Sequence, residues 1–342
     1  MTGSPKEERT LNAHNQPLVT VFSLGGTIAS TNTPGANGGG VTPQLDAKEL
    51  LASVPGLGEA AALEAVAFRQ TASGDLTFDD LTVLAAEISV RFETGVAGVV
   101  VVQGTDTIEE TSFALDLLID APNPVVVTGA MRNPTLAGPD GPANLRAAVQ
   151  VAAAPEARGL GCLVVLNDEI HAARFVSKTH TSSPAAFRSM TAGPIGWLVE
   201  GRPRIVLRTT PLPGVPAPTG PIPPVALLTM CLGEDERLIE QVGALGYAGL
   251  VVESFGGGHV SARTVSALER LAATIPVVLA SRTGGGDMLQ ATYGFPGSER
   301  DLIARGLIPA GFLDGLRARI LLSLLLGNDA GIEQVRTVYA SV

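Results

Sequence analysis

Short runs of β-branched and other apolar residues recur along this chain, and intervals long enough for a helix separate many of them. Apolar runs of this kind are typical of strands that are buried on both faces, as in a parallel sheet covered by helices. Alanine- and leucine-rich intervals, such as 76–93 and 141–154, have the apolar spacing of those helices. The sequence therefore predicts an α/β protein. The predicted strands are 18–22, 99–102, 124–127, 162–166, 225–229, 250–252 and 276–279.

A proline-rich segment divides the predicted strands into two groups. Residues 208–224 read RTTPLPGVPAPTGPIPP, and proline at this density excludes both a helix interior and a central strand. With 342 residues, the chain is also longer than the roughly 250–300 residues at which a single core stops growing. We expect an N-terminal domain over 17–207, a linker over 208–224 and a C-terminal domain over 225–342.

The charge and hydropathy of the chain exclude several classes of partner. The net charge is −10 and Lys and Arg form no cluster, so nucleic acid and anionic membranes are expected to be repelled. The apolar runs are far shorter than the roughly 20 residues that cross a bilayer. Residues 1–16 are polar and do not resemble a secretory signal, so we expect a cytoplasmic protein. Cys162 and Cys231 are expected to be buried free thiols.

Polar, glycine-bearing loops follow several predicted strands, and in open α/β sheets such loops meet at one crevice. In the first loop, SLGGTIAST, two glycines allow a tight turn that exposes the hydroxyl of Thr27, as a nucleophile requires. Taken alone, the segment equally fits an ordinary turn in which Thr27 caps the next element. It lacks the Gly-Lys pair and the G-x-G-x-x-G spacing of phosphate-binding loops, so it does not indicate a nucleotide site.

Two further segments carry candidate catalytic groups. The strand VVVV leads into Gly104, Thr105 and Asp106, where a hydroxyl beside a carboxylate can activate a nucleophile and backbone N–H groups can hold an oxyanion. Lys178 is a rare lysine among hydroxyl residues, and close to Asp106 it could accept a hydroxyl proton. Helix capping and a solvated lysine are the alternatives for these segments. His171 and His180 lack the spacing of a zinc motif, and no metal site is predicted.

Taken in order, the segments resemble the bacterial L-asparaginase family from about Leu18 to the final helix. The resemblance lies in GGTIAS, in QGTDT with Gln103 where the family often has histidine, and in TGAMRNP, DGPANLRAAV and LNDEIHAARFVSKTHT. It implies that Thr27 is the nucleophile of an acyl-enzyme. It also implies that Thr105, Asp106 and Lys178 form a second catalytic group, and that the substrate is bound by Ser73 and Asp75 beside the glycines Gly26 and Gly104.

The same resemblance implies a fold and an assembly. The fold would be a larger N-terminal α/β domain with a mixed sheet and a smaller, flavodoxin-like C-terminal domain with a parallel sheet. The substrate would be a small amino-acid amide, and no cofactor would be required. The assembly would be a homotetramer built from close dimers, or a homodimer, in which the partner's C-terminal domain helps to close the site. The loop SFGGGH, with His259, would take part in that closure.

The sequence departs from the family pattern after the first threonine. The family has a tyrosine in this mobile loop, whereas residues 31–45 contain none; their glycines still suit a lid. One hypothesis is that Tyr293 supplies a phenol from elsewhere. Glu299 lies in the region from which the family often contacts the substrate amine of a neighbouring subunit, and it is a second candidate.

Three other functions are compatible with parts of this pattern. A glutaminase or another small-amide hydrolase would use the same threonines, because the pocket decides the substrate. An asparaginase-like subunit of an archaeal-type tRNA amidotransferase is disfavoured by the short polar N-terminus and the acidic charge. A non-catalytic amino-acid sensor would explain the missing tyrosine, but it would not need Thr27, Thr105, Asp106 and Lys178 together.

Overall fold

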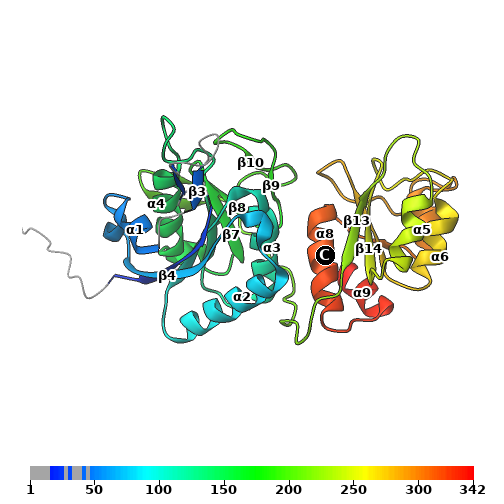
Figure 1. Cartoon of the computed structure of the whole chain (residues 1–342), viewed down its shortest axis with the longest axis horizontal. Coiled ribbons are helices and arrows are strands. Elements are labelled where there is room, and N and C mark those ends of the chain that lie inside the picture. Colours follow the sequence, from blue (N-terminus) through cyan, green and yellow to red (C-terminus); the bar gives the residue numbers. More distant parts are fainter. Residues whose placement is uncertain (1–15, 27–29, 33–40, 44–46) are drawn as a thin grey trace, which may run out of the picture.

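The structure is a computed structural model that describes residues 16–26, 30–32, 41–43 and 47–342. It contains an N-terminal and a C-terminal α/β unit joined by an extended segment (Figure 1). The N-terminal unit has a mixed sheet and the C-terminal unit a parallel sheet, so the predicted fold class is confirmed.

The N-terminal sheet has eight strands in the order β12-β11-β8-β7-β6-β5-β1-β4. The strands from β4 to β7 are parallel, whereas β8, β11 and β12 continue the sheet in antiparallel fashion. The short antiparallel pairs β9/β10 and β2/β3 lie outside it. The strands are β1 Leu18–Gly25, β2 Ser30–Asn32, β3 Val41–Pro43, β4 Ala62–Thr71, β5 Gly98–Val102, β6 Val125–Thr128, β7 Cys162–Leu166, β8 Glu169–Ala172, β9 Val176–Lys178, β10 Phe187–Ser189, β11 Gly196–Val199 and β12 Arg202–Ile205.

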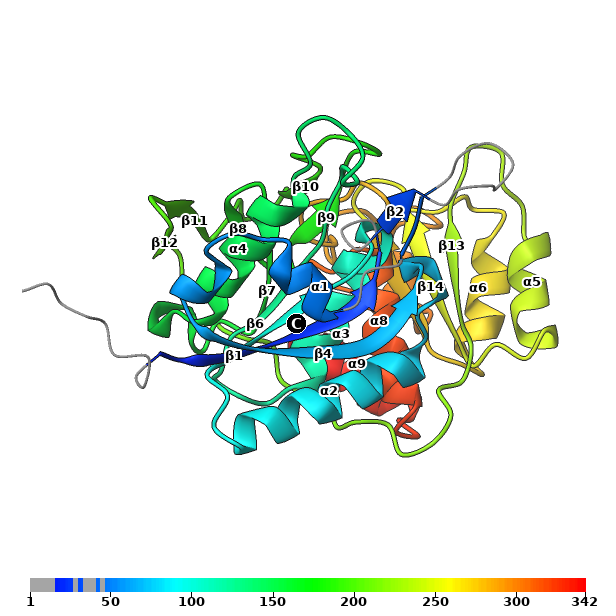
Figure 2. The same cartoon turned by 60° about the vertical axis from the view of Figure 1, so that its left-hand side comes forward.

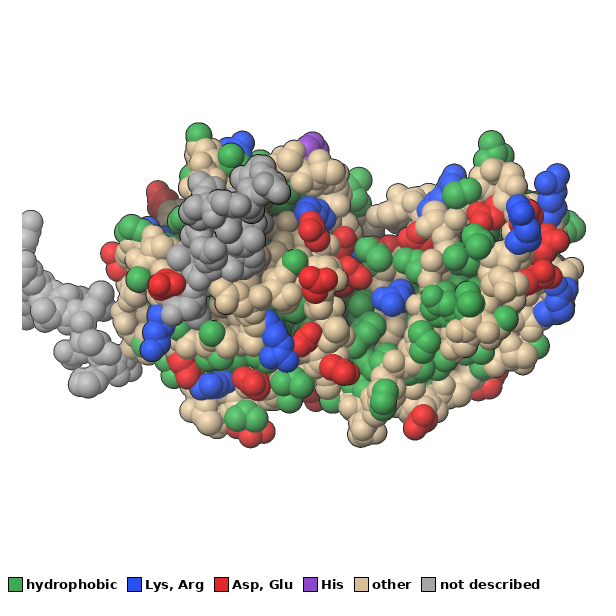
Figure 3. Space-filling view, in the orientation of Figure 1, with side chains coloured by type: hydrophobic (Ala, Val, Ile, Leu, Met, Phe, Trp, Pro, Cys, Tyr) green, Lys and Arg blue, Asp and Glu red, His purple; other side chains and the backbone are tan. Residues whose placement is uncertain are grey.

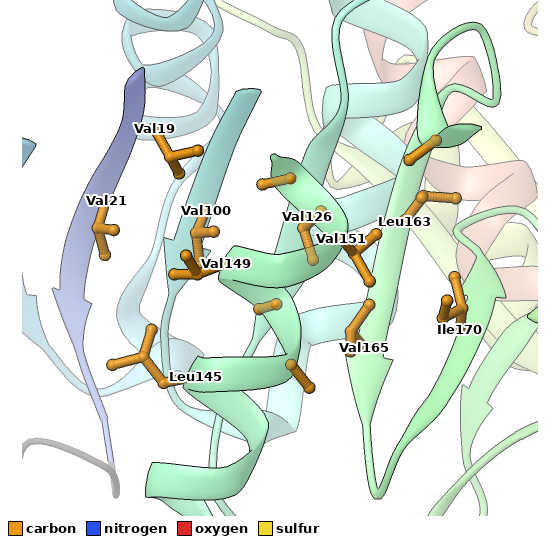
Figure 4. Close-up of a cluster of buried hydrophobic side chains, with 14 of the residues drawn as sticks. Val19, Val21, Val100, Val126, Leu145, Val149, Val151, Leu163, Val165 and Ile170 are labelled. Carbon is orange, nitrogen blue, oxygen red and sulfur yellow. The ribbon is translucent and has the colours of Figure 1, made fainter. Parts of the chain in front are cut away.

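Helices cover both faces of this sheet, which explains why its inner parallel strands β5, β6 and β7 are apolar along nearly their whole length, whereas the edge strand β4 is mixed and partly exposed. On one face, α4 (Gly141–Ala152) packs over the strands through Leu145, Val149 and Val151 (Figure 4). The short helix α1 (Ala47–Ala52) contributes Leu50 to the same core.

The opposite face is covered by α2 (Phe78–Glu93) and α3 (Ile108–Leu118). Helix α2 begins with a capping box: the Thr77 hydroxyl accepts from the Asp80 backbone N–H, and the Asp80 carboxylate accepts from the Thr77 N–H. The start of α3 matters for the site, because this helix follows directly from the loop that carries Thr105 and Asp106.

The C-terminal sheet has four parallel strands in the order β13-β14-β15-β16, with helices on both faces. Helices α5 and α6 pack on one face, whereas α8 and α9 pack on the face nearer the N-terminal domain (Figures 1 and 2). The strands are β13 Val225–Thr229, β14 Gly249–Ser254, β15 Val277–Ser281 and β16 Ile308–Pro309. The helices are α5 Arg237–Ala244, α6 Val265–Ala272, α7 Glu299–Ala304, α8 Gly315–Leu326 and α9 Ile332–Tyr339.

Helix α8 is more deeply buried than a helix that covers one face of a sheet usually is. Most of its residues are buried, including Arg317, because the helix lies between the C-terminal sheet and α3 of the N-terminal domain. One apolar core joins Phe113 and Leu117 of α3 to Leu321 and Leu324 of α8. The two domains therefore share a packed interface.

The segment between β12 and β13 contains no helix or strand in the described chain. It follows the N-terminal domain for part of its course, since Val215 N–H donates to the Leu117 carbonyl at 2.8 Å. The linker limits of 208 and 224 stay a prediction. Among the residues described, no helix is long and apolar enough to span a membrane. The two cysteines differ: Cys162 is buried as predicted, but Cys231 is exposed, because it lies in the turn after β13 rather than within the strand.

Asp116 on α3 predicts a pH effect on stability. Burial raises the pKa of its carboxyl to about 6, although the Cys162 N–H that it accepts at 2.6 Å and the Arg174 charge act against the shift. Because the folded state holds this proton more tightly than the unfolded chain, stability should fall as pH rises from about 4 to 6. We expect Asp116→Asn to remove up to about 2 kcal/mol of that fall. Urea unfolding of both proteins at pH 4.5 and 7.5 gives the change in unfolding free energy between the two pH values. An equal change in the wild type and in Asp116→Asn would contradict the prediction.

Candidate active site

Three loops meet closely at the carboxyl end of the N-terminal sheet. Gly26, after β1, has a φ of +87°, and a Cβ atom there would lie 2.1 Å from the Gly104 backbone nitrogen. On its other side Gly104 faces Ser73, since a Cβ on Gly104 would lie 2.8 Å from the Ser73 Oγ. Glycine is therefore required at position 26 for the two loops to approach each other, and a side chain at 104 would displace the Ser73 hydroxyl. The three loops meet through backbone groups and one hydroxyl.

Lys178 reaches this crevice from β9 and contacts two candidate groups. Its Nζ donates to the Thr105 Oγ1 at 2.8 Å and lies 2.5 Å from the Asp106 Oδ1. Thr105 is buried and the Lys178 side chain is 15% exposed, whereas the Asp106 side chain is 80% exposed. Asp106 therefore faces solvent on one side of the ammonium group, and Thr105 lies on the enclosed side.

This triplet has the parts of a proton-transfer group. A lysine amine can take a proton from a hydroxyl, and a neighbouring carboxylate balances the charge that then forms. Two hydrogen bonds of the neighbouring Thr107 stabilise the loop that carries Thr105 and Asp106. The Thr107 Oγ1 donates to the Ser73 carbonyl at 3.0 Å, and the buried Gln103 amide donates to the Thr107 Oγ1 at 3.2 Å. Gln103 thus supports the loop at the position where the family often has histidine.

The two residues predicted to bind substrate lie together in the short 3-10 helix η4 (Ser73–Asp75). This helix packs against η5 (Thr105–Thr107), which carries the catalytic loop. Ser73 is buried against Gly104 and Asp75 is exposed. Their separation allows one to line the crevice while the other meets its open edge.

Tyr293, His259 and Glu299 form a separate cluster in the C-terminal domain. The His259 ring lies edge-on to the Tyr293 ring, with centroids 4.9 Å apart, and its Nε2 is 3.2 Å from the Glu299 Oε2. Glu299 is fully buried, and its Oε1 accepts from the backbone N–H groups of Thr292 and Tyr293. Burial raises the pKa of Glu299, but these donors and His259 outweigh it and hold the pKa below its usual range.

The structure thus gives Glu299 a role inside its own domain, where its carboxylate shapes the 292–293 turn. Sequence reasoning did not foresee this contact. The roles predicted for Glu299 and His259 toward a neighbouring subunit, and for the Tyr293 phenol, stay predictions. Tyr293 is 44% exposed and so remains available for contacts.

The remaining histidine of interest, His171, is buried in β8 and bonded within the protein. Its Nδ1 lies 2.9 Å from the Ser189 Oγ on β10, and its Nε2 lies 3.3 Å from the Glu169 carboxylate. Burial lowers the pKa of His171, although Glu169 acts in the opposite direction. In the part of the chain that the structure covers, no three acidic, histidine or cysteine side chains are grouped as metal ligands. His171 is a structural tie between β8 and the β9/β10 hairpin.

Thr27 itself, with residues 33–40 of the predicted glycine-rich lid, lies outside the described residues. Its role as nucleophile stays a prediction. The structure does place its neighbour Gly26 against Gly104, beside the loop of Thr105.

Comparison with known families agrees with this arrangement of domains and motifs. Residues 18–210 match the family model described as asparaginase, N-terminal. Residues 224–339 match the model described as glutaminase/asparaginase C-terminal domain. Together the two models account for most of the chain.

Similar proteins match over nearly the whole length. A probable L-asparaginase of Deinococcus radiodurans is 38% identical over 94% of this chain and 97% of its own length. A probable periplasmic L-asparaginase of Haemophilus influenzae is 32% identical, covering 92% and 90%. The crystal structure of a probable cytoplasmic L-asparaginase from Campylobacter jejuni superposes with a TM-score of 0.84 at 28% identity, covering 96% of this chain and all of that one.

Proposed function

Because this chain belongs to the L-asparaginase family of amidohydrolases, we propose that it hydrolyses L-asparagine to L-aspartate and ammonia through a threonine acyl-enzyme. The observation that carries the proposal is the contact of Lys178 with both Thr105 and Asp106, next to the glycine loop that precedes Thr27.

In the first step, the Thr27 hydroxyl attacks the carbon of the side-chain amide and loses its proton toward the Thr105–Lys178 pair. The oxyanion that forms is held by backbone N–H groups of the loops at Gly26 and Gly104, a contribution that commonly reaches several kcal/mol. The same pair gives that proton to the amide nitrogen, the C–N bond breaks and ammonia leaves, and an aspartyl ester on Thr27 remains.

In the second step, water replaces the amine. Lys178 and Asp106 are placed to accept a proton through Thr105 while water attacks the ester, and L-aspartate leaves as Thr27 regains its proton. Ser73 and Asp75 hold the amino and carboxylate groups of the amino acid in both steps. The chemistry uses only groups of the protein, in keeping with the expectation that no cofactor is needed.

A substrate panel tests this function and separates it from the alternatives. We expect the purified protein to release ammonia from L-asparagine. L-Glutamine differs by one methylene, so its kcat/KM should be lower by about 10- to 200-fold. Ammonia release from L-asparagine, L-glutamine and D-asparagine, compared by kcat/KM, measures the preference.

The same panel has two outcomes that would replace the proposal. A higher kcat/KM for L-glutamine would make the protein a glutaminase. Binding of L-aspartate in a calorimeter without ammonia release from any amide would favour the amino-acid sensor.

We further propose that the protein acts in the cytoplasm as a homotetramer, or at least a homodimer, without nucleic-acid or membrane partners. The net charge of −10 supports the last part, and the cytoplasmic location rests on the similarity to the probable cytoplasmic L-asparaginase of Campylobacter jejuni. Acidic and basic side chains are interspersed over the face shown in Figure 3. The assembly rests on the family resemblance, in which a partner's C-terminal domain closes the site.

A further inference from the structure

Lys178 lies on β9, a strand that does not pair with any strand of the main sheet. Strand β9 pairs only with β10 among the described strands, and this two-stranded sheet is separate from the eight-stranded one. The ammonium group must nevertheless stay within hydrogen-bond distance of Thr105 and Asp106, which belong to the loop after β5. The tie from His171 reaches Ser189 on β10, and Val176 packs on the main-sheet core, so the position of β9 depends on side-chain contacts rather than on strand pairing with the main sheet.

The buried side chain of Arg317, on α8 of the C-terminal domain, makes several of these contacts. Its guanidinium donates to the Val176 carbonyl, to the Ala173 carbonyl at 3.2 and 3.3 Å, and to the Ser177 Oγ at 3.3 Å. These contacts end at the residue directly before Lys178. The side chain is 3% exposed, so it is shielded from competing water.

Both the backbone and the side chain of Arg317 are fixed by hydrogen bonds. Asp314, the N-cap of α8, accepts from the Arg317 guanidinium and from its backbone N–H. Glu109, on the helix that continues from Thr105 and Asp106, lies close enough to Arg317 and Ser177 to interact with both. Burial raises the pKa of Glu109, and the charge of Arg317 acts against that shift.

These contacts connect the three elements whose relative positions determine the geometry of the site. Glu109 belongs to the helix behind Thr105 and Asp106, Ser177 belongs to the strand of Lys178, and Arg317 belongs to the C-terminal domain. In Figures 1 and 2, α3 and α8 lie next to each other at the domain boundary, and they are in contact. Because a buried charge without its partners is costly, the arrangement strongly favours one position of β9.

We propose that Arg317 is a positioning residue for Lys178: through the backbone of β9 it sets the distance of the lysine from Thr105 and Asp106. The C-terminal domain thereby contributes to catalysis within a single subunit. This inference rests on the proposed function, in which Lys178 transfers the proton. It predicts that loss of Arg317 affects the chemical step more than substrate binding, since Ser73 and the glycine loops do not depend on α8.

The experiment compares Arg317→Met with Arg317→Lys and with Arg319→Met as the matched control. Arg319 lies two residues further along α8; it donates to the Val225 carbonyl and lies over the Phe78 ring of α2, so it too faces the N-terminal domain, but none of the described hydrogen bonds joins it to β9. We expect Arg317→Met to lower kcat by about 10²-fold with little change in KM, the size of effect that a displacement of about 1 Å can produce. Arg317→Lys should recover part of the loss, and Arg319→Met should stay close to the wild type.

Two readouts separate positioning from general destabilisation. In a Lys178→Met background, Arg317→Met should cost no further activity, because the residue through which it acts is gone. Hydrogen exchange of residues 174–179 should become faster in Arg317→Met and not in Arg319→Met. If Arg317→Met does not fold, Arg317→Lys carries both comparisons.

The inference is overturned if the Arg317 variants keep the wild-type kcat, or if their losses are the same with and without Lys178. If the wild-type protein releases no ammonia from L-asparagine, the proposed function fails instead. The hydrogen-exchange comparison then still decides whether Arg317 holds β9, because it does not depend on activity.

Discussion

The Lys178→Met variant is expected to lose about 10²- to 10⁴-fold in kcat, the range that a positioned proton acceptor contributes. Methionine has a similar length and flexibility, so it can occupy the largely buried path of the lysine chain while removing the ammonium group. Thr105 and Asp106 would both lose the donor that now lies 2.8 and 2.5 Å away. The change should be measured as steady-state ammonia release from L-asparagine, with KM determined in the same series.

The chain offers a matched control in Lys48, an exposed lysine on α1. Lys48→Met removes the same charge and should leave kcat unchanged. The stability cost of Lys178→Met should be small, because Asp106 is 80% exposed and water can solvate it when the ion pair is lost. A Lys178→Met protein that turns over at the wild-type rate would show that the lysine transfers no proton in this reaction.

The Thr27→Ala variant is expected to lose about 10⁴- to 10⁶-fold in kcat, as hydrolases do when the nucleophile is removed. Thr105 is not expected to take its place, because it is buried and already accepts from Lys178. Binding of L-aspartate should survive, because Ser73, Gly26 and Gly104 remain. Calorimetry of the variant with L-aspartate checks this second part, and lost binding would indicate a disrupted loop instead of a missing nucleophile.

The parallel strands could be predicted from the sequence because burial on both faces leaves a strong signal. Val99–Val102 and Cys162–Leu166 are apolar at every position, and both are fully within strands of the central sheet. The antiparallel edge could not be predicted in the same way. Strand β11 is short and partly exposed, with Trp197 40% accessible, so its pattern resembles that of a loop.

The burial of α8 is a tertiary effect that a local pattern does not contain. GLRARILLSLLL has its two arginines at positions 317 and 319, which point to opposite sides of a helix, so the pattern alone does not tell which of them is buried. In the structure Arg317 is buried because carbonyls of a strand about 140 residues earlier accept its hydrogen bonds. Only the packing of the two domains creates that environment, and the sequence gives no local sign of it.

Part of the candidate site could be predicted from the sequence. The glycines before Thr27 and the polar end of β5 are local features with a physical reason, and Gly26 and Gly104 do meet in the structure. The pairing of Lys178 with Thr105 spans 73 residues, and only the family resemblance joined them beforehand. The bonds of the buried Glu299 carboxylate to the turn at Thr292 and Tyr293 were predicted neither by the pattern nor by the resemblance, and its role toward a neighbouring subunit stays a prediction.

Ammonia release from L-asparagine by the wild type and by Thr27→Ala, measured side by side, decides whether this protein hydrolyses amides with a threonine nucleophile. We expect steady turnover by the wild type and almost none by the variant, at equal protein concentration and with L-aspartate binding intact in both. Turnover by Thr27→Ala at the wild-type rate would contradict the acyl-enzyme mechanism.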